Sequence, residues 1–184
     1  MVITLGSQYY RVIGIPEASF GLLGALVAAL GIVVPQIARH LTETRTPFYN
    51  LMVLFIVTLV SLLWMTLLTP YLGFIPALML FGTMGMVSFF VSHYLNRLAA
   101  SGIRATVLSF KGLAYNISYG FLGVLYAILV SSRRSSVLSK EPSLLDQGLE
   151  DHVFMDTFCT FPITFVILMG LFLLYAVGKG RRGI

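Results

Sequence analysis

The sequence predicts an all-α fold, a polytopic bundle of five transmembrane helices in a single domain that covers residues 1–184. Hydrophobic residues make up 58% of the chain and charged residues only 10%, and the apolar residues gather in five long runs. A soluble domain carries about 25% charged residues, so this composition suits lipid better than water. The runs are continuous rather than alternating, which favours helices over the strands of a membrane barrel.

Each apolar run is long enough to cross the hydrocarbon core of a bilayer, which takes about 20 residues in a helix. We expect the spans at residues 18–38, 48–68, 71–96, 105–131 and 154–178. Residues 1–12 are too short to span, and their two tyrosines suit the membrane interface. The single cysteine excludes an intrachain disulfide.

The connections between the spans predict the orientation of the chain. Basic residues gather in the first and third connections and in the C-terminal tail, where we expect them to anchor the topology: Arg39, Arg97, Arg104, Arg181 and Arg182. The second connection is a tight turn, and the fourth, a predicted loop over residues 132–153, carries acids as well as bases. The positive-inside rule therefore places the C-terminus in the cytoplasm. Loops at a membrane explain the net charge of +5 without a nucleic-acid partner.

Small residues mark helix faces that are expected to pack closely. Gly24 and Ala28 form a small-xxx-small pair on the first span, and such pairs let helices approach in lipid. This face is either an ordinary packing surface or one against which another helix rocks. Gly82 and Gly85 form a similar face on the third span.

Two polar residues continue the glycine face of the third span. Ser92 and His93 lie on the same side of the helix as these glycines. The rest of the helix is apolar, so this side should face protein or water rather than lipid. His93 is either a proton-sensitive group beside a substrate path or a hydrogen-bonded side chain near the cytoplasmic interface.

The fourth span carries a polar side and a neighbouring small-residue side. The polar side would suit the wall of a substrate cavity, and its residues are Lys111, Tyr115, Ser118 and Tyr119. The small side would suit packing, with Asn116 bonding across to another helix and Gly120 and Gly123 allowing close approach. Lys111 either binds an anionic substrate or extends its ammonium to the cytoplasmic interface.

The residue patterns of enzymes are missing from the sequence. The three histidines lie in separate segments without the spacing of metal ligands, so no metal site is predicted. No glycine-rich loop leads into a phosphate site, and no paired carboxylates lie within the spans. We therefore expect neither catalysis nor a cofactor.

The segment 93–123, HYLNRLAASGIRATVLSFKGLAYNISYGFLG, resembles the tenth-to-eleventh helix passage of major facilitator superfamily transporters. The Arg-Ala-Thr-x-Leu-Ser run at residues 104–109, the basic Lys111 and the Asn-x-x-Tyr-Gly-like segment at residues 116–120 carry this resemblance. Residues 14–26, GIPEASFGLLGAL, resemble the start of helix eight. In the family, the loop after that helix often carries a Gly-x-x-x-Asp-Arg type motif. The corresponding segment here, PQIARHLTETRTP, keeps basic residues but lacks the glycine and the aspartate of that motif.

This resemblance implies that the five spans are helices eight to twelve of a C-terminal half and that residues 1–12 end helix seven. It implies that the chain is a fragment of a secondary active transporter of the bacterial inner membrane. The whole transporter moves a small solute by alternating access, and the fragment is expected to be inactive alone. The expected partners are the lipid bilayer, a small-molecule substrate, and either the missing N-terminal half or a second copy as a homodimer mate. The alternative is a non-transporting membrane interaction protein that uses its small-residue faces.

Overall fold

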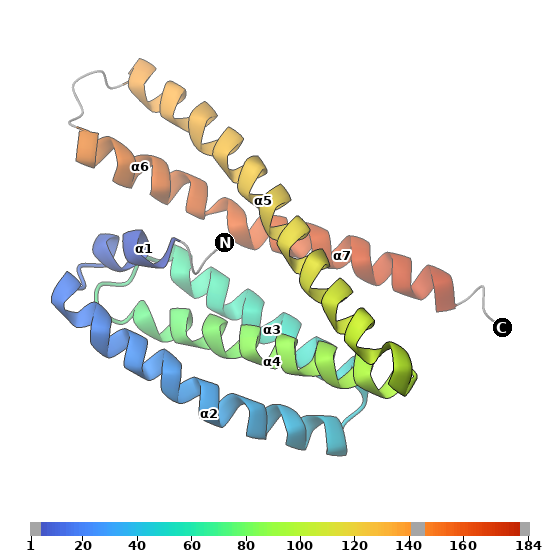
Figure 1. Cartoon of the computed structure of the whole chain (residues 1–184). Coiled ribbons are helices and arrows are strands. Elements are labelled where there is room, and N and C mark those ends of the chain that lie inside the picture. Colours follow the sequence, from blue (N-terminus) through green and yellow to red (C-terminus); the bar gives the residue numbers. More distant parts are fainter. Residues whose placement is uncertain (1–4, 141–145, 181–184) are drawn as a thin grey trace.

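A computed structural model of the protein describes residues 5–140 and 146–180, which form helices and turns without a β-strand (Figure 1). Five helical segments of these residues are long and apolar enough to cross a membrane, which confirms the predicted number and suits an integral membrane protein. The elements in chain order are α1 (Gly6–Val12), η1 (Glu17–Ser19), α2 (Phe20–Thr44), α3 (Pro47–Thr66), α4 (Phe74–Leu98), η2 (Ser101–Ile103), α5 (Arg104–Lys140), α6 (Asp146–Phe158) and α7 (Thr160–Gly180).

Helices α2, α3 and α4 form a three-helix bundle in which α4 packs against both neighbours (Figure 1). Ala38, Leu54 and Phe90, one from each helix, form a buried apolar cluster. The sharp connection between α2 and α3 follows from local chemistry. Thr46 caps α3 by accepting the backbone N–H of Tyr49 at 3.3 Å, and a proline occupies the first helical position, where no N–H is needed.

The predicted loop over residues 132–153 is wrong, because helices occupy most of it. Helix α5 continues to Lys140, beyond the predicted end of its span at residue 131. The hydroxyls of Ser135 and Ser136 donate to backbone carbonyls four residues earlier, at 3.1 and 3.2 Å, so this polar segment satisfies its hydroxyls within the helix. Helix α6 then buries one apolar face, made of Leu149, Val153, Phe154 and Phe158.

The last predicted span is two helices rather than one. Helix α6 ends at Phe158 and α7 begins at Thr160. Pro162 explains the break, because it has no N–H to donate to the carbonyl of Phe158, four residues earlier, and its ring crowds that carbonyl. The two helices together still supply one apolar segment, Gly148–Tyr175, that is long enough to span.

The short helix α1 caps one end of the bundle. Tyr9 and Tyr10, the two tyrosines that suit the membrane interface, are buried in the protein, with 1% and 8% of their surfaces exposed. The hydroxyl of Tyr9 donates to the carbonyl of Gly73 at 3.2 Å, and its ring stacks on Phe158. Burial raises the pKa of Tyr9 above its ordinary value, and the neighbouring Tyr10 raises it further.

A glycine with a left-handed backbone ends α1. Gly14 has φ +80°, and its N–H donates to the carbonyl of Arg11, while the N–H of Ile15 donates to the carbonyl of Tyr10. This pair of bonds is the Schellman motif, in which glycine avoids the steric cost of a side chain at positive φ. The carbonyl of Ile13 then accepts the N–H of Tyr71 at 3.1 Å, which ties this end of the chain to the α3–α4 turn.

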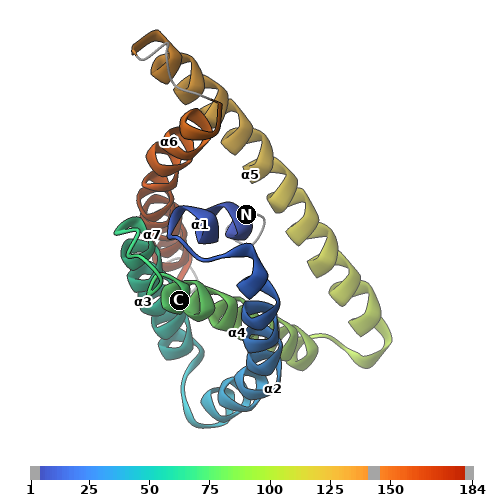
Figure 2. The same ribbon diagram turned by 90° about the vertical axis from the view of Figure 1, so that its left-hand side faces the viewer.

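Helix α5 diverges from α2 and α3 in both views (Figures 1 and 2). It contacts α4 near its N-terminal end and α6 near its C-terminal end, where Arg134 pairs with Glu150 at 3.4 Å. None of the residues in its most apolar window is buried by the described chain. The sides of α5 are therefore open to lipid or to another protein.

Candidate functional site

The polar faces predicted for the third and fourth spans meet at one contact. Lys111, on the second turn of α5, donates from its ammonium to the hydroxyl oxygen of Ser92 on α4 at 2.7 Å. The same ammonium lies 5.5 Å from the centroid of the Tyr115 ring, one turn farther along α5. Cation–π attraction and the hydrogen bond together hold the ammonium between the two helices. The structure thus brings together Lys111 and Tyr115, two of the four residues predicted for the cavity wall, with Ser92 from the polar face of the third span.

The hydroxyl of Ser92 has a second bond that orients it. It donates its proton to the carbonyl of Ser88, four residues earlier, at 2.8 Å. A lone pair is therefore left to accept from Lys111. Ser92 acts here as an acceptor that positions the ammonium.

An open groove of about 420 Å³ runs between α2 and α4 and includes Ser92. Apolar side chains such as Val34 and Phe89 line most of it, and Ser88 and Ser92 are its only hydroxyl-bearing residues. Small-molecule sites span about 300–1,000 Å³, are mostly apolar and carry a few polar groups. The groove has these properties, and its polar end is the residue that holds Lys111.

His93 lies apart from this contact. Its ring stacks on Phe89 at 6.1 Å between centroids and meets Tyr94 edge-on at 5.4 Å. No hydrogen bond joins His93 to another described residue. The two interpretations of His93 from the sequence therefore both stay predictions.

A buried amide that the sequence interpretation missed joins the three-helix bundle. Asn50 on α3 is 1% exposed, and its Nδ2 donates to the carbonyl of Leu41 on α2 at 3.3 Å and to Tyr94 Oη on α4 at 3.0 Å. Its Oδ1 has no hydrogen-bond partner among the described residues. The lone amide early in a largely apolar run was the available signal, since an amide within a membrane helix calls for a partner.

The two glycines of the third span lie where α2 and α4 approach each other. A Cβ added at Gly85 would lie 3.0 Å from Val34 Cγ1, and one added at Gly82 would lie 3.8 Å from Val34 Cγ2. Gly85 is therefore needed for the close approach, whereas Gly82 makes only an ordinary contact.

The other predicted packing residues lie on surfaces that the described chain leaves open. Gly24 and Ala28 are exposed on α2, and a Cβ at Gly24 would meet nothing within 4 Å. A Cβ at Gly120 or Gly123 on α5 would likewise meet nothing within 4 Å. The expected packing at these positions does not occur within the described chain, because no neighbouring helix covers those faces.

The remaining polar residues of α5 also lie in the open. Asn116, Ser118 and Tyr119 are exposed. The bond expected from Asn116 to another helix is absent from the described part of the chain, in which α5 diverges from α2 and α3 (Figure 2).

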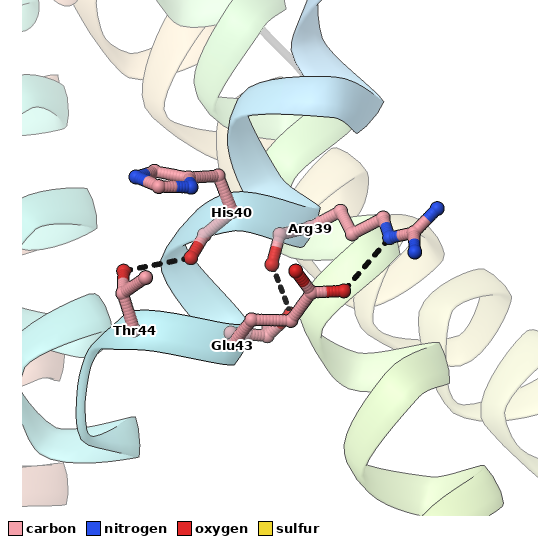
Figure 3. Close-up of polar contacts among 5 residues, drawn as sticks. Arg39, His40, Glu43 and Thr44 are labelled. Atoms are coloured by element: carbon pink, nitrogen blue, oxygen red, sulfur yellow. Dashed lines mark hydrogen bonds and ion pairs between the residues drawn. The ribbon is translucent and has the colours of Figure 1, made fainter.

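The basic residues of the first and third connections lie at one end of the bundle, opposite the α3–α4 turn (Figure 1). Arg39 pairs with Glu43 one turn later at 2.8 Å. Figure 3 draws this contact. Arg97 is exposed on the last turn of α4, and Arg104 Nε donates to the carbonyl of Ala99 at 3.3 Å. The last two predicted anchors, Arg181 and Arg182, lie outside the described residues.

Within residues 5–140 and 146–180, no group of three or more His, Cys, Asp or Glu side chains could hold a metal ion. Comparison with known protein families, with curated proteins and with solved structures found no match for this chain. The resemblance to major facilitator transporters therefore stays a prediction from the residues that carry it.

Proposed function

We propose that this chain is the C-terminal part of a secondary active transporter of the major facilitator type. It acts in the bacterial inner membrane, with a cytoplasmic C-terminus, and takes part in moving a small solute by alternating access. The observation that carries the proposal is the contact of Lys111 with Ser92, because polar faces of two long apolar helices meet there.

Polar groups within membrane helices are costly unless they face protein or water. The polar side of α5 extends from Lys111 through Tyr115 and Ser118, and the latter two are exposed. A water-filled cavity enclosed by further helices would satisfy this side. Alternating access also needs two helix bundles that move against each other around a central site. The proposed partner is therefore an N-terminal half, or a second copy of this chain in the same orientation, because the two halves of the family are parallel repeats.

Proteoliposomes test whether this chain requires a partner. We expect the purified chain alone to show no saturable uptake of labelled sugars, organic acids, peptides or drugs above empty liposomes. Saturable uptake by the chain alone would contradict the requirement.

The partner is sought in the DNA upstream of the Met1 codon. An in-frame extension that encodes the rest of helix seven and a further bundle supports the proposal. That extended protein should then transport one class of solute, and Lys111→Ala should change its kinetics at unchanged expression. An extended protein indistinguishable from empty liposomes for every solute class would refute the transport function.

One observation favours the second candidate, a non-transporting membrane interaction protein. Gly24 and Ala28 present a small-residue face on α2 that nothing in the described chain covers. A partner protein that co-purifies in a stoichiometric amount, shows no transport activity and no longer binds after Gly24→Ile would decide for this candidate. Gly170→Ile is the matched control, since a Cβ at Gly170 on α7 also meets nothing within 4 Å.

A further inference from the structure

Lys111 carries a charge within a membrane span, and the described chain offers it no counter-charge. Neither of the two helices that flank it, α4 and α5, contains an aspartate or a glutamate. The ion pairs of the described residues are Arg11–Glu17, Arg39–Glu43 and Arg134–Glu150, and none of them includes Lys111. An unpaired charge at membrane depth is costly, so a bound anion would stabilise this arrangement.

The ammonium is held away from the nearer end of its helix. Lys111 lies seven residues into α5 from Arg104, about 10 Å along the axis at 1.5 Å per residue. Its partner Ser92 lies six residues before the end of α4 at Leu98, about 9 Å from that end. The side chain therefore bonds across to α4 at this depth rather than reaching toward the rim.

The ammonium also has donors to spare. It carries three N–H groups, and Ser92 accepts one of them. The Tyr115 ring contacts it through its π face and accepts no conventional hydrogen bond. Two N–H groups remain, and a carboxylate or phosphate oxygen is the strongest acceptor for such a cation.

The groove between α2 and α4 extends from Ser92 and is apolar along most of its lining. We infer that Lys111 and this groove bind an amphipathic organic anion, a carboxylate or phosphate group carried on an apolar body. The anionic group pairs with the Lys111 ammonium, and the apolar body lies along Val34 and Phe89. This inference rests on the proposed function, because it names the substrate class of the same site.

Two sources could supply this chemistry. A small organic acid would be the transported solute, whereas an anionic lipid would place its phosphate on Lys111 and an acyl chain in the groove. The whole chain in nanodiscs of phosphatidylcholine distinguishes them, because that lipid has no net charge. Benzoate is the soluble probe, benzamide is its neutral counterpart, and phosphatidylglycerol is the lipid probe.

Lysine methyl groups report directly on the site. The chain has three lysines, Lys111, Lys140 and Lys179, so carbon-13 dimethylation gives three lysine signals beside that of the α-amino group, and Lys111→Arg identifies the one from the site. We expect benzoate to shift the Lys111 signal saturably while the other two stay in place, and benzamide to leave it unmoved. If phosphatidylglycerol produces the shift and benzoate then adds nothing, the anion is a lipid headgroup.

Three results would overturn the inference. The Lys111 signal could ignore both benzoate and phosphatidylglycerol, all three lysine signals could shift in parallel as a general salt effect, or benzamide could act as benzoate does. In equilibrium binding of labelled benzoate, Lys111→Gln should weaken affinity by about 10- to 100-fold, the range of a charge-assisted hydrogen bond.

The groove is tested without touching Lys111. Gly31 lines it, and a Cβ at this position meets nothing within 4 Å, so Gly31→Leu should fold and fill the groove. We expect about tenfold weaker benzoate binding, the equivalent of roughly two buried CH₂ groups. Gly21→Leu is the control, since Gly21 is equally open on the same helix and lies outside the groove. Equal affinity of the two variants would contradict the placement of the apolar body.

Binding and transport can fail separately. These binding measurements do not require transport. If benzoate binds at Lys111 but the assembled protein never transports a solute, the anion site stands and the proposed transport function is refuted. Transport by the assembled protein with an unresponsive Lys111 refutes the anion site alone.

Discussion

Gly73 makes the contact between α1 and the α3–α4 turn sensitive to a single methyl group. A Cβ added there would lie 2.6 Å from Tyr9 Oη, 3.1 Å from Ile13 Cδ1 and 3.1 Å from the carbonyl oxygen of Thr69. The first distance is too short for any contact, and the third involves backbone that cannot rotate away. Gly73→Ala must therefore displace Tyr9, whose hydroxyl donates to the Gly73 carbonyl.

The expected cost of Gly73→Ala combines two effects. Overpacking a tight site costs about 1–3 kcal/mol, and losing the tyrosine hydrogen bond costs about 0.5–1.5 kcal/mol, so we expect about 2–4 kcal/mol in all. Thermal unfolding in detergent, followed by circular dichroism, measures the loss. Gly21→Ala is the control, because a Cβ at this exposed position meets nothing within 4 Å.

A double mutant separates this packing from general damage. Tyr9→Phe removes the oxygen that the new methyl group would meet, so Tyr9→Phe with Gly73→Ala should recover about 1–2 kcal/mol relative to the sum of the single changes. Wild-type stability of Gly73→Ala, or strict additivity of the two substitutions, would refute the described packing of α1 on the turn.

Three further predictions concern the bundle. Asn50→Ala should lower the free energy of unfolding by about 1–2 kcal/mol, because the amide joins three helices, although removing its unpaired Oδ1 offsets part of the loss. Asn116 is exposed, so Asn116→Ala should change nothing measurable in the same assay. Gly85→Ala should cost about 1 kcal/mol by pushing α2 from α4, and Gly82→Ala should be neutral in thermal unfolding; equal effects would contradict the close approach. Burial raises the pKa of Tyr9, so the contribution of its neutral hydroxyl to stability is complete below the ordinary pKa of 10.0 and is lost as pH rises above it. The stability of Tyr9→Phe, measured by unfolding at alkaline pH, should lack this part of the pH dependence.

The number of spans could be predicted from the sequence because it depends on local properties. An apolar run of sufficient length identifies a membrane helix without knowledge of its neighbours. The polar side of α5 likewise follows from the spacing of Lys111, Tyr115 and Ser118. The meeting of Lys111 with Ser92 does not follow from it, because that contact depends on where α4 and α5 cross.

The missed features depend on contacts between distant segments. The charged residues of α6 make this segment resemble a loop, yet its buried apolar residues form two pairs spaced four residues apart, Leu149 with Val153 and Phe154 with Phe158. This apolar spacing is present in the sequence, but the acidic residues around it are typical of a loop. The burial of Tyr9 had no local signal, since it needs the α3–α4 turn, distant in sequence, to cover the ring.

The central claim is that the polar side of α5 lines a water-filled cavity in the assembled protein. Cysteine accessibility in native membranes tests it, starting from Cys159→Ser, which removes the only cysteine of the chain. Single cysteines then replace the polar side of α5: Lys111, Tyr115, Ser118 and Tyr119. The controls are Leu113, Ile117 and Val124, which lie on the opposite side at about 100° per residue and are also exposed in the described chain.

A charged, membrane-impermeant thiol reagent should modify the four polar-side cysteines at least about tenfold faster than the three controls, because water reaches only a cavity wall and lipid covers the opposite side. Slow and equal modification at all seven positions would mean that lipid or packed protein surrounds α5 on every side. That result would contradict a solute cavity at Lys111.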